Sequence, residues 1–234
     1  VGGLDPLLYD RDPVSHLDTV FDLAERDGKG IDIHLHESGT AGVFSLEEIA
    51  ARTKALAMSG HVTVSHAFAL HTNPDAQVRR VLDLLSEAGV ALTTVAPQNG
   101  VLPQSAIAER HIALGLGEDG QRDHWSPYGD GDLLRRTWQL AFTNGFRRDE
   151  DIERCLDIAS RGGAQIMDGT RPDGSPLTED ARFGLAVGAP ADFILHEADT
   201  VTSAIMDCPR DRDVFRSGQL IASGGELLGG LRLG

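Results

Sequence analysis

Three short clusters of histidine and carboxylate residues stand out in this sequence, because side chains of these types can bind a metal ion or transfer protons. They are His34-Leu35-His36-Glu37, Ser65-His66 and Gly117-Glu118-Asp119-Gly120. Two or more imidazoles with a carboxylate suit a borderline divalent ion such as Zn²⁺ or Fe²⁺, with one position open for water. Such an ion lowers the pKa of its bound water to about 7, which generates hydroxide at neutral pH. A single histidine at a strand end more often has a structural role, but three clusters together favour a metal site.

Each cluster follows a short apolar run that the residue pattern predicts to be a β-strand. The predicted strands cover residues 31–34, 61–65, 90–95 and 111–116, and the predicted helices cover 14–24, 45–60, 74–88, 132–143 and 149–160. Ser45, followed by Glu48, predicts a capping box at the start of the second helix. Strands that alternate with helices of this length form parallel βαβ units, whose active sites lie at the carboxyl edge of the sheet. We therefore expect the three clusters to converge at one edge.

The pattern changes after about Gly169. The chain becomes rich in Gly, Pro and Asp, and the short apolar runs at 193–195, 214–215 and 220–222 predict antiparallel strands. This change predicts two domains, an α/β domain over residues 1–168 and a small β-sandwich segment over residues 169–234.

Composition limits the classes of partner and location. The chain has 234 residues and a formal net charge of −15, which would repel a phosphate backbone, so we expect no nucleic-acid partner. No apolar run reaches the roughly 18 residues of a membrane span, and the first residues show no secretory signal. We therefore expect no membrane association and a cytoplasmic location. The two cysteines, Cys155 and Cys208, are too few and too far apart to predict a disulfide framework or a thiolate metal site.

Four segments resemble motifs of the amidohydrolase superfamily, and within it of the cytosine deaminase group. Residues 31–37 (IDIHLHE) resemble the fifth-strand motif of that group, residues 62–67 (VTVSHA) the sixth-strand motif, and residues 117–129 (GEDGQRDHWSPYG) the eighth-strand motif. Residues 184–193 are similar to the return of the chain into the C-terminal β-sandwich. The last motif is common to the whole superfamily, whereas the His-x-x-Glu spacing and the Asp-to-Trp loop favour the deaminase group.

The resemblance implies a role for each candidate residue. His34 and Asp119 would bind one divalent metal ion, Zn or Fe, with His66 as a further candidate ligand. Glu37 would relay protons, Asp119 would act as the base, and His66 would orient the substrate or act as an acid or base. Trp125 would form a wall of the substrate pocket. The implied reaction is hydrolytic deamination of a small nitrogen heterocycle (a cytosine-like pyrimidine, a triazine or a pterin), with metal-bound hydroxide as the nucleophile.

One feature of the superfamily is missing from the sequence. Its members begin a (β/α)8 TIM barrel with a His-x-His pair on the first strand, but the spacing from His34 to Asp119 leaves room for only about four βα units. We therefore assign His34 to the fifth strand, so that the chain is the second half of a barrel with strands one to four absent. An isolated half barrel exposes sheet edges, which predicts a homo-oligomer or association with the missing N-terminal half.

Two other functions stay open at this point. The same metal site would serve an amidohydrolase that cleaves a cyclic or acyl C–N amide bond. Because the first-strand His-x-His is absent, the chain would also fit a non-catalytic fragment or a metal-free relative, and we expect the fragment alone to be inactive.

Overall fold

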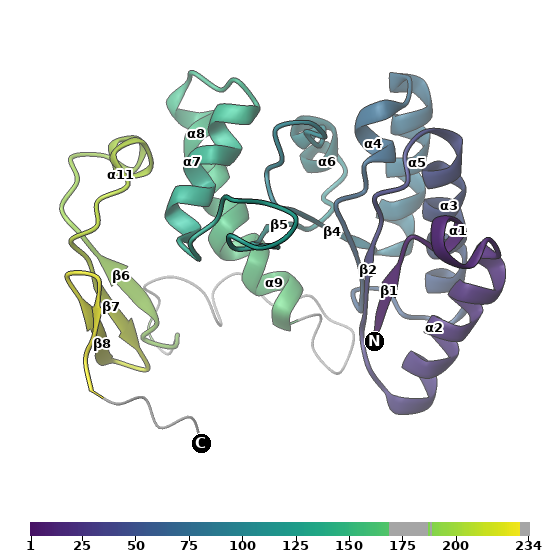
Figure 1. Cartoon of the computed structure of the whole chain (residues 1–234), viewed down its shortest axis with the longest axis horizontal. Coiled ribbons are helices and arrows are strands. Elements are labelled where there is room, and N and C mark those ends of the chain that lie inside the picture. The colour runs from purple at the N-terminus through teal and green to yellow at the C-terminus, as the bar shows by residue number, and fades with distance from the viewer. Residues whose placement is uncertain (169–186, 188, 230–234) are drawn as a thin grey trace.

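The fold is described from a computed structural model of the chain, which describes residues 1–168, 187 and 189–229 (Figure 1). A parallel sheet with its helices forms the larger part of the molecule, and a small antiparallel sheet lies at the end farthest from the first strand. The domain boundary predicted at residue 169 lies outside the described residues.

Five parallel strands form the larger sheet in the order of the sequence. They are β1 (Gly2–Leu4), β2 (Ile31–His34), β3 (Val62–Ser65), β4 (Ala91–Thr94) and β5 (Leu114–Leu116). The four predicted strands are confirmed, and the structure adds β1, which the sequence pattern does not predict and which pairs with β2 from Gly2 to Leu4. Counted back from β2 as the fifth strand, β1 takes the place of the fourth, so the expectation that strands one to four are all absent is wrong for that strand. β1 has only three residues, two of them glycines, so it shows no alternation of apolar and polar residues that could predict a strand. Its strand conformation depends on pairing with β2 in the folded protein.

The helices pack on one face of this sheet (Figure 1). The helices of this part are α1 (Pro6–Asp10), α2 (Pro13–Asp27), α3 (Gly39–Ala55), α4 (Ala69–Thr72), α5 (Asp75–Ala88), α6 (Gln104–Glu109), α7 (Leu133–Thr143), α8 (Asp149–Asp157) and α9 (Gly163–Asp168), with a π-helical segment (Ile158–Gly162) between α8 and α9. Ile33, Val64 and Leu92 are completely buried beneath the helices. On the opposite face, Ser65 Oγ donates to Asp32 Oδ1 at 2.8 Å. The alternation of apolar and polar residues along these strands therefore sets which face carries chemistry.

The predicted capping box at Ser45 is wrong. α3 begins at Gly39, so Ser45 lies in its second turn, where it is completely buried. The buried residues of this helix start at Gly42 and Val43 and continue through Leu46, so the buried face begins before Ser45 and the helix extends further toward its N-terminus. Ser45 Oγ instead donates to Glu37 Oε2 at 2.6 Å.

The second sheet is antiparallel, as predicted. It contains β6 (Phe193–Leu195), β7 (Asp213–Arg216), β8 (Gln219–Ser223) and β9 (Glu226–Leu227), and α11 (Val201–Asp207) packs against α7 and α8. The rings of Phe193 and Phe215 stack with centroids 4.7 Å apart. None of the helices in the described ranges combines the length and the apolarity needed to cross a membrane.

Asp132 and Arg212 join this sheet to α7. Asp132 caps the N-terminus of α7 through the N–H of Leu134, and Arg212 Nη1 donates to Asp132 Oδ1 at 2.9 Å. The hydrogen bond from Arg212 lowers the pKa of Asp132. Because the folded pKa lies below the unfolded value, the pair stabilises the fold above about pH 4, and this stabilisation is lost as the pH falls through the folded pKa.

We expect Arg212→Gln to lower the free energy of unfolding at pH 7 by about 1–2 kcal/mol and to have a smaller effect below about pH 3. Urea unfolding at both pH values measures the difference. Arg148→Gln, which removes an exposed pair with Glu150, is the control and should change little at either pH. An Arg212→Gln effect that does not depend on pH would contradict the assignment.

Candidate metal and catalytic site

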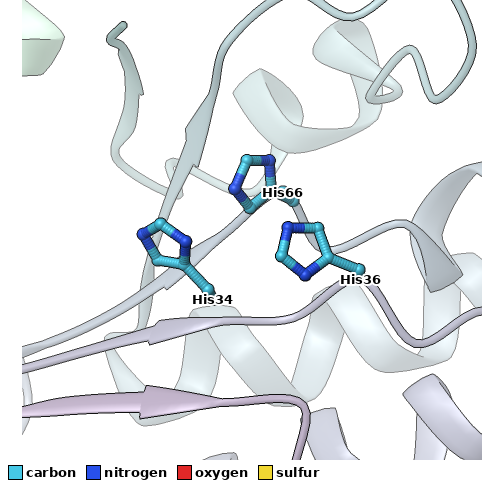
Figure 2. A group of neighbouring side chains, drawn as sticks. All are labelled: His34, His36 and His66. Carbon is cyan, nitrogen blue, oxygen red and sulfur yellow. The ribbon is translucent and has the colours of Figure 1, made fainter. Parts of the chain in front are cut away.

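Three imidazoles meet at the carboxyl edge of the parallel sheet. His34 ends β2, His36 follows two residues later, and His66 comes directly after β3, so the three rings face one another (Figure 2). Each ring offers a nitrogen within 4.8 Å of the nitrogens offered by the other two. Within the described ranges, this is the only group of at least three His, Cys, Asp or Glu side chains that meets this distance. We call it the histidine cluster.

Strand register and one backbone turn bring the rings together. The pairing of His34 with Ser65 places the ends of β2 and β3 at the same level. His66 and Ala67 then adopt left-handed conformations, with φ of 71° and 47°. Non-glycine residues rarely adopt this conformation, and it is concentrated at functional sites. The turn sets His66 against the ring of His36, with centroids 4.4 Å apart, and against that of His34, at 5.0 Å.

His66 is neutral at physiological pH. Burial, followed by the nearby rings of His36 and His34, lowers its pKa to about 4. Only 5% of the residue is exposed, and its Nε2 is buried without a hydrogen-bond partner among the described residues. An unpartnered buried nitrogen is rare and needs an explanation. A neutral imidazole with a free nitrogen is the form that binds a divalent ion.

Asp119 lies beside the histidine cluster and outside it. Its Oδ2 is 3.8 Å from His66 Nε2, which is too long for a hydrogen bond. Its side chain is 53% exposed. The structure thus brings His34 and His66 together as expected, with Asp119 next to His66, and adds His36 as a third ring.

Glu37 is bound by backbone and hydroxyl donors. Its Oε1 accepts from the N–H groups of Leu7 at 2.6 Å and Leu8 at 3.0 Å, at the N-terminus of α1, and its Oε2 accepts from Ser45. Only 8% of Glu37 is exposed. A carboxylate at a helix N-terminus satisfies free N–H groups and interacts favourably with the helix dipole. These contacts give Glu37 a structural role, and its role as a proton relay stays a prediction.

Asp5 is the residue that the sequence did not reveal. It directly follows β1, is 2% exposed, and its Oδ2 lies 2.8 Å from His36 Nδ1. Its Oδ1 accepts from the N–H of His36 at 2.6 Å. Recognition of β1 would have placed Asp5 at the same sheet edge as the three clusters, and this is the signal that could have found it.

Trp125 and Asp119 line a common cavity of about 630 Å³. Trp125 is 87% exposed, and Tyr128, Trp138 and Phe142 add further aromatic surface to this cavity. An apolar wall with a few polar groups is typical of small-molecule sites. The cavity therefore lies next to the histidine cluster, on the side of Asp119.

A buried ion pair supports the turn that carries Asp119. Arg136 Nε donates to Glu118 Oε1 at 3.0 Å, and Arg136 Nη1 donates to the Val95 carbonyl at 3.1 Å. The two side chains are 9% and 13% exposed. Arg136 thus links the ends of β4 and β5 to α7.

The family of this chain follows from its match to known sequences. The model of the amidohydrolase family matches residues 6–221, which is most of the length. The chain belongs to the amidohydrolase family. This assignment confirms the superfamily that the motifs predicted, and the relatives of this amidohydrolase chain include deaminases.

Three relatives are informative. The N-isopropylammelide isopropyl amidohydrolase of Pseudomonas sp. (strain ADP) is 27% identical over 94% of this chain and 53% of its own length. The pterin deaminase of Rhizobium rhizogenes (strain K84 / ATCC BAA-868) is 25% identical over 94% of this chain and 51% of its own length. The crystal structure of N-isopropylammelide isopropylaminohydrolase from Burkholderia multivorans ATCC 17616 superimposes with a TM-score of 0.88 and 39% identity, covering 97% of this chain and 56% of that one.

Likeness to a further structure supports the fold alone. 5-Methylcytosine deaminase from Klebsiella pneumoniae, liganded with phosphonocytosine, gives a TM-score of 0.80 at 23% identity, over 95% of this amidohydrolase chain and 56% of that one. The chain spans about half the length of the curated relatives it matches. These relatives imply an α/β fold of TIM-barrel type, and the described residues supply its parallel sheet together with a separate antiparallel sheet.

Proposed function

We propose that this chain forms the metal-binding half of a hydrolase that removes an amino or alkylamino group from a ring carbon of a small nitrogen heterocycle. The single observation that carries the proposal is the histidine cluster, with the carboxylate of Asp119 beside it. The names of the relatives support the substrate class, since they act on N-isopropylammelide and on a pterin. A triazine, a cytosine-like pyrimidine or a pterin is the proposed substrate, and water is the second reactant.

The donor set suits one divalent ion, zinc or iron. Imidazole nitrogens are common ligands of both, and the buried Nε2 of His66 has no other partner among the described residues. His34 and His66 would hold the ion, with Asp119 as a further ligand from the side of β5. When bound, the ion would supply positive charge and lower the pKa of a water molecule at the open position.

The protein residues would orient the substrate and move protons. Asp119, exposed to the cavity and next to His66, would accept a proton from the attacking water. Neutral His66 would orient the reacting groups, and Glu37 would take up the second proton of this water and pass it to the leaving nitrogen. Trp125 would cover one face of the ring.

The arrangement of strands supports the second half of a (β/α)8 barrel. We propose that residues 1–168 form this half and that residues 169–234 form a segment of a β-sandwich. Among the described residues, β1 and β5 are the edge strands of this sheet, and they would pair with a complementary half of the protein or with another copy. A cytoplasmic location stays a prediction.

Glu37→Gln tests the reaction class. Glutamine keeps one oxygen for the N–H groups of Leu7 and Leu8, and Ser45 can turn to accept from the new amide, so the fold should persist. If Glu37 relays protons, release of ammonia or alkylamine from heterocyclic substrates should fall by about 10²–10⁴-fold in the intact protein.

The exposed Glu47→Gln is the matched control and should retain full activity. Cleavage of cyclic amides that Glu37→Gln leaves unchanged, without amine release from heterocyclic substrates, would instead favour the amide-hydrolysing reaction. If the wild-type protein binds zinc but shows neither amine release nor amide cleavage, the proposal is overturned.

A further inference from the structure

The carboxylate of Asp5 contacts the chain segment that carries His36. We propose that Asp5 is a positioning residue, which fixes the tautomer and the direction of the His36 ring so that its Nε2 becomes a third nitrogen donor of the histidine cluster. That the ligand of these nitrogens is a divalent metal ion rests on the proposed function. The effect of Asp5 on the tautomer of His36 does not depend on it and can be measured in the metal-free chain.

The orientation of the Asp5 carboxylate is set by backbone donors. Its Oδ1 accepts from the N–H of His36 at 2.6 Å and from that of Glu37 at 3.2 Å. These two bonds direct Oδ2 toward His36 Nδ1, 2.8 Å away. Because a carboxylate oxygen accepts and cannot donate, Nδ1 must carry the proton. The neutral ring then has its lone pair on Nε2, the nitrogen left to face the cluster.

The side chain of Asp5 serves this contact and not its own helix. Asp5 precedes α1 at the N-cap position, where an aspartate usually accepts from the helix N–H groups, but its side chain makes no such bond. Its backbone is left-handed, with φ of 38°, a conformation that aspartate tolerates better than most residues. The carboxylate therefore reaches across to the end of β2.

Glu37 takes over the vacated capping position. Its Oε1 accepts from the N–H groups of Leu7 and Leu8. The segments after β1 and β2 thus bind each other through their carboxylates. Asp5 accepts from the N–H of Glu37, and Glu37 caps the helix that follows Asp5. This reciprocal pair fixes one loop against the other, and His36 lies within it.

Two further features connect His36 to the cluster. The centroid of its ring lies 4.4 Å from that of His66, and its side chain is 37% exposed. The bond to Asp5 adds a directional polar contact to the ring contacts of His36 with His66 and Phe68. A carboxylate on the far nitrogen of a metal-binding histidine fixes its tautomer, and loss of such a partner costs about 10–100-fold in metal affinity.

Asp5→Asn gives a sharp test, because it should reverse the tautomer. Asn Oδ1 must stay with the two backbone N–H groups, so its amide group would face His36 Nδ1 and donate to it. The His36 proton would move to Nε2 and block the lone pair. The measurements are ¹⁵N NMR of the histidine rings in the metal-free full chain and calorimetric titration with Zn²⁺ alone.

We expect Asp5→Asn to invert the His36 ring signals and to weaken zinc binding by about 10–100-fold. Asp10→Asn is the matched control, because Asp10 Oδ2 also binds a histidine, His16 Nδ1 at 2.6 Å, outside the cluster. It should change only the His16 ring signals and leave the His36 signals and the zinc affinity unchanged. If Asp5 acts through His36, the double variant with His36→Ala should bind zinc as weakly as His36→Ala alone.

Each outcome supports or overturns the inference. The inference is overturned if Asp5→Asn leaves the His36 signals unchanged. It is also overturned if the zinc-affinity losses of Asp5→Asn and His36→Ala add up in the double variant. In both cases, zinc binding by the wild type would leave the proposed function standing. Inverted signals in a chain that binds no zinc would support the positioning role and overturn the metal site of the proposed function. If Asp5→Asn does not fold, His36→Ala still tests the inference. A zinc affinity of His36→Ala equal to that of wild type would exclude His36 as a donor and overturn the inference.

Discussion

Asp119→Asn is expected to lower kcat by about 10³-fold or more in the intact protein, with a smaller change in KM. Asparagine has the same size and keeps an oxygen toward His66 Nε2, which lies 3.8 Å from Asp119 Oδ2, but it cannot accept a proton at neutral pH. General base catalysis contributes about 10²–10⁴-fold, and loss of a charged ligand adds to this. Steady-state kinetics with an amine-releasing substrate measure the effect.

The control for Asp119 lies in the same loop. Asp123 Oδ1 accepts from the N–H of Trp125 at 2.9 Å, a bond that asparagine can also accept, so Asp123→Asn removes the same charge without touching the proposed base. We expect its activity to stay within about 3-fold of wild type, well above the loss expected for a base. Zinc content measured on both variants separates a ligand from a base. An Asp119→Asn protein with wild-type kcat would exclude Asp119 from proton transfer.

Arg136→Met is expected to lower the free energy of unfolding by about 3–5 kcal/mol, because it leaves the carboxylate of Glu118 buried without its partner. Arg136 also donates to the carbonyl of Val95, so the ends of β4 and β5 lose a common support. Urea unfolding measures the change. Adding Glu118→Leu should restore part of the stability, since the unpaired charge is then removed.

The exposed pair of Arg80 and Glu47 gives the comparison for Arg136. Its side chains are 55% and 32% exposed, and we expect Arg80→Met to cost less than about 1 kcal/mol. Equal effects of the two substitutions would mean that the pair of Arg136 and Glu118 is screened by water in spite of its burial.

The sequence alone determined the order of β2 to β5 and of the longer helices between them, and the edge of the sheet at which the chemistry lies. Period-2 and period-3.6 patterns are local, so β2 to β5 and the longer helices could be read from neighbouring residues. The same local logic placed His34, His66 and Asp119 after strand ends. The family could be recognised because its motifs occupy those short segments.

Only the tertiary structure decided which side chains meet. The bond between Asp5 and His36 joins residues 31 positions apart, across a strand with no apolar pattern of its own. Glu37 has the expected spacing from His34, yet the direction of its carboxylate depends on the N–H groups of α1, and Ser45 became its donor only because α3 begins before it. Spacing along a chain determines the face on which a residue lies, whereas side-chain direction depends on donors and acceptors that folding brings from elsewhere.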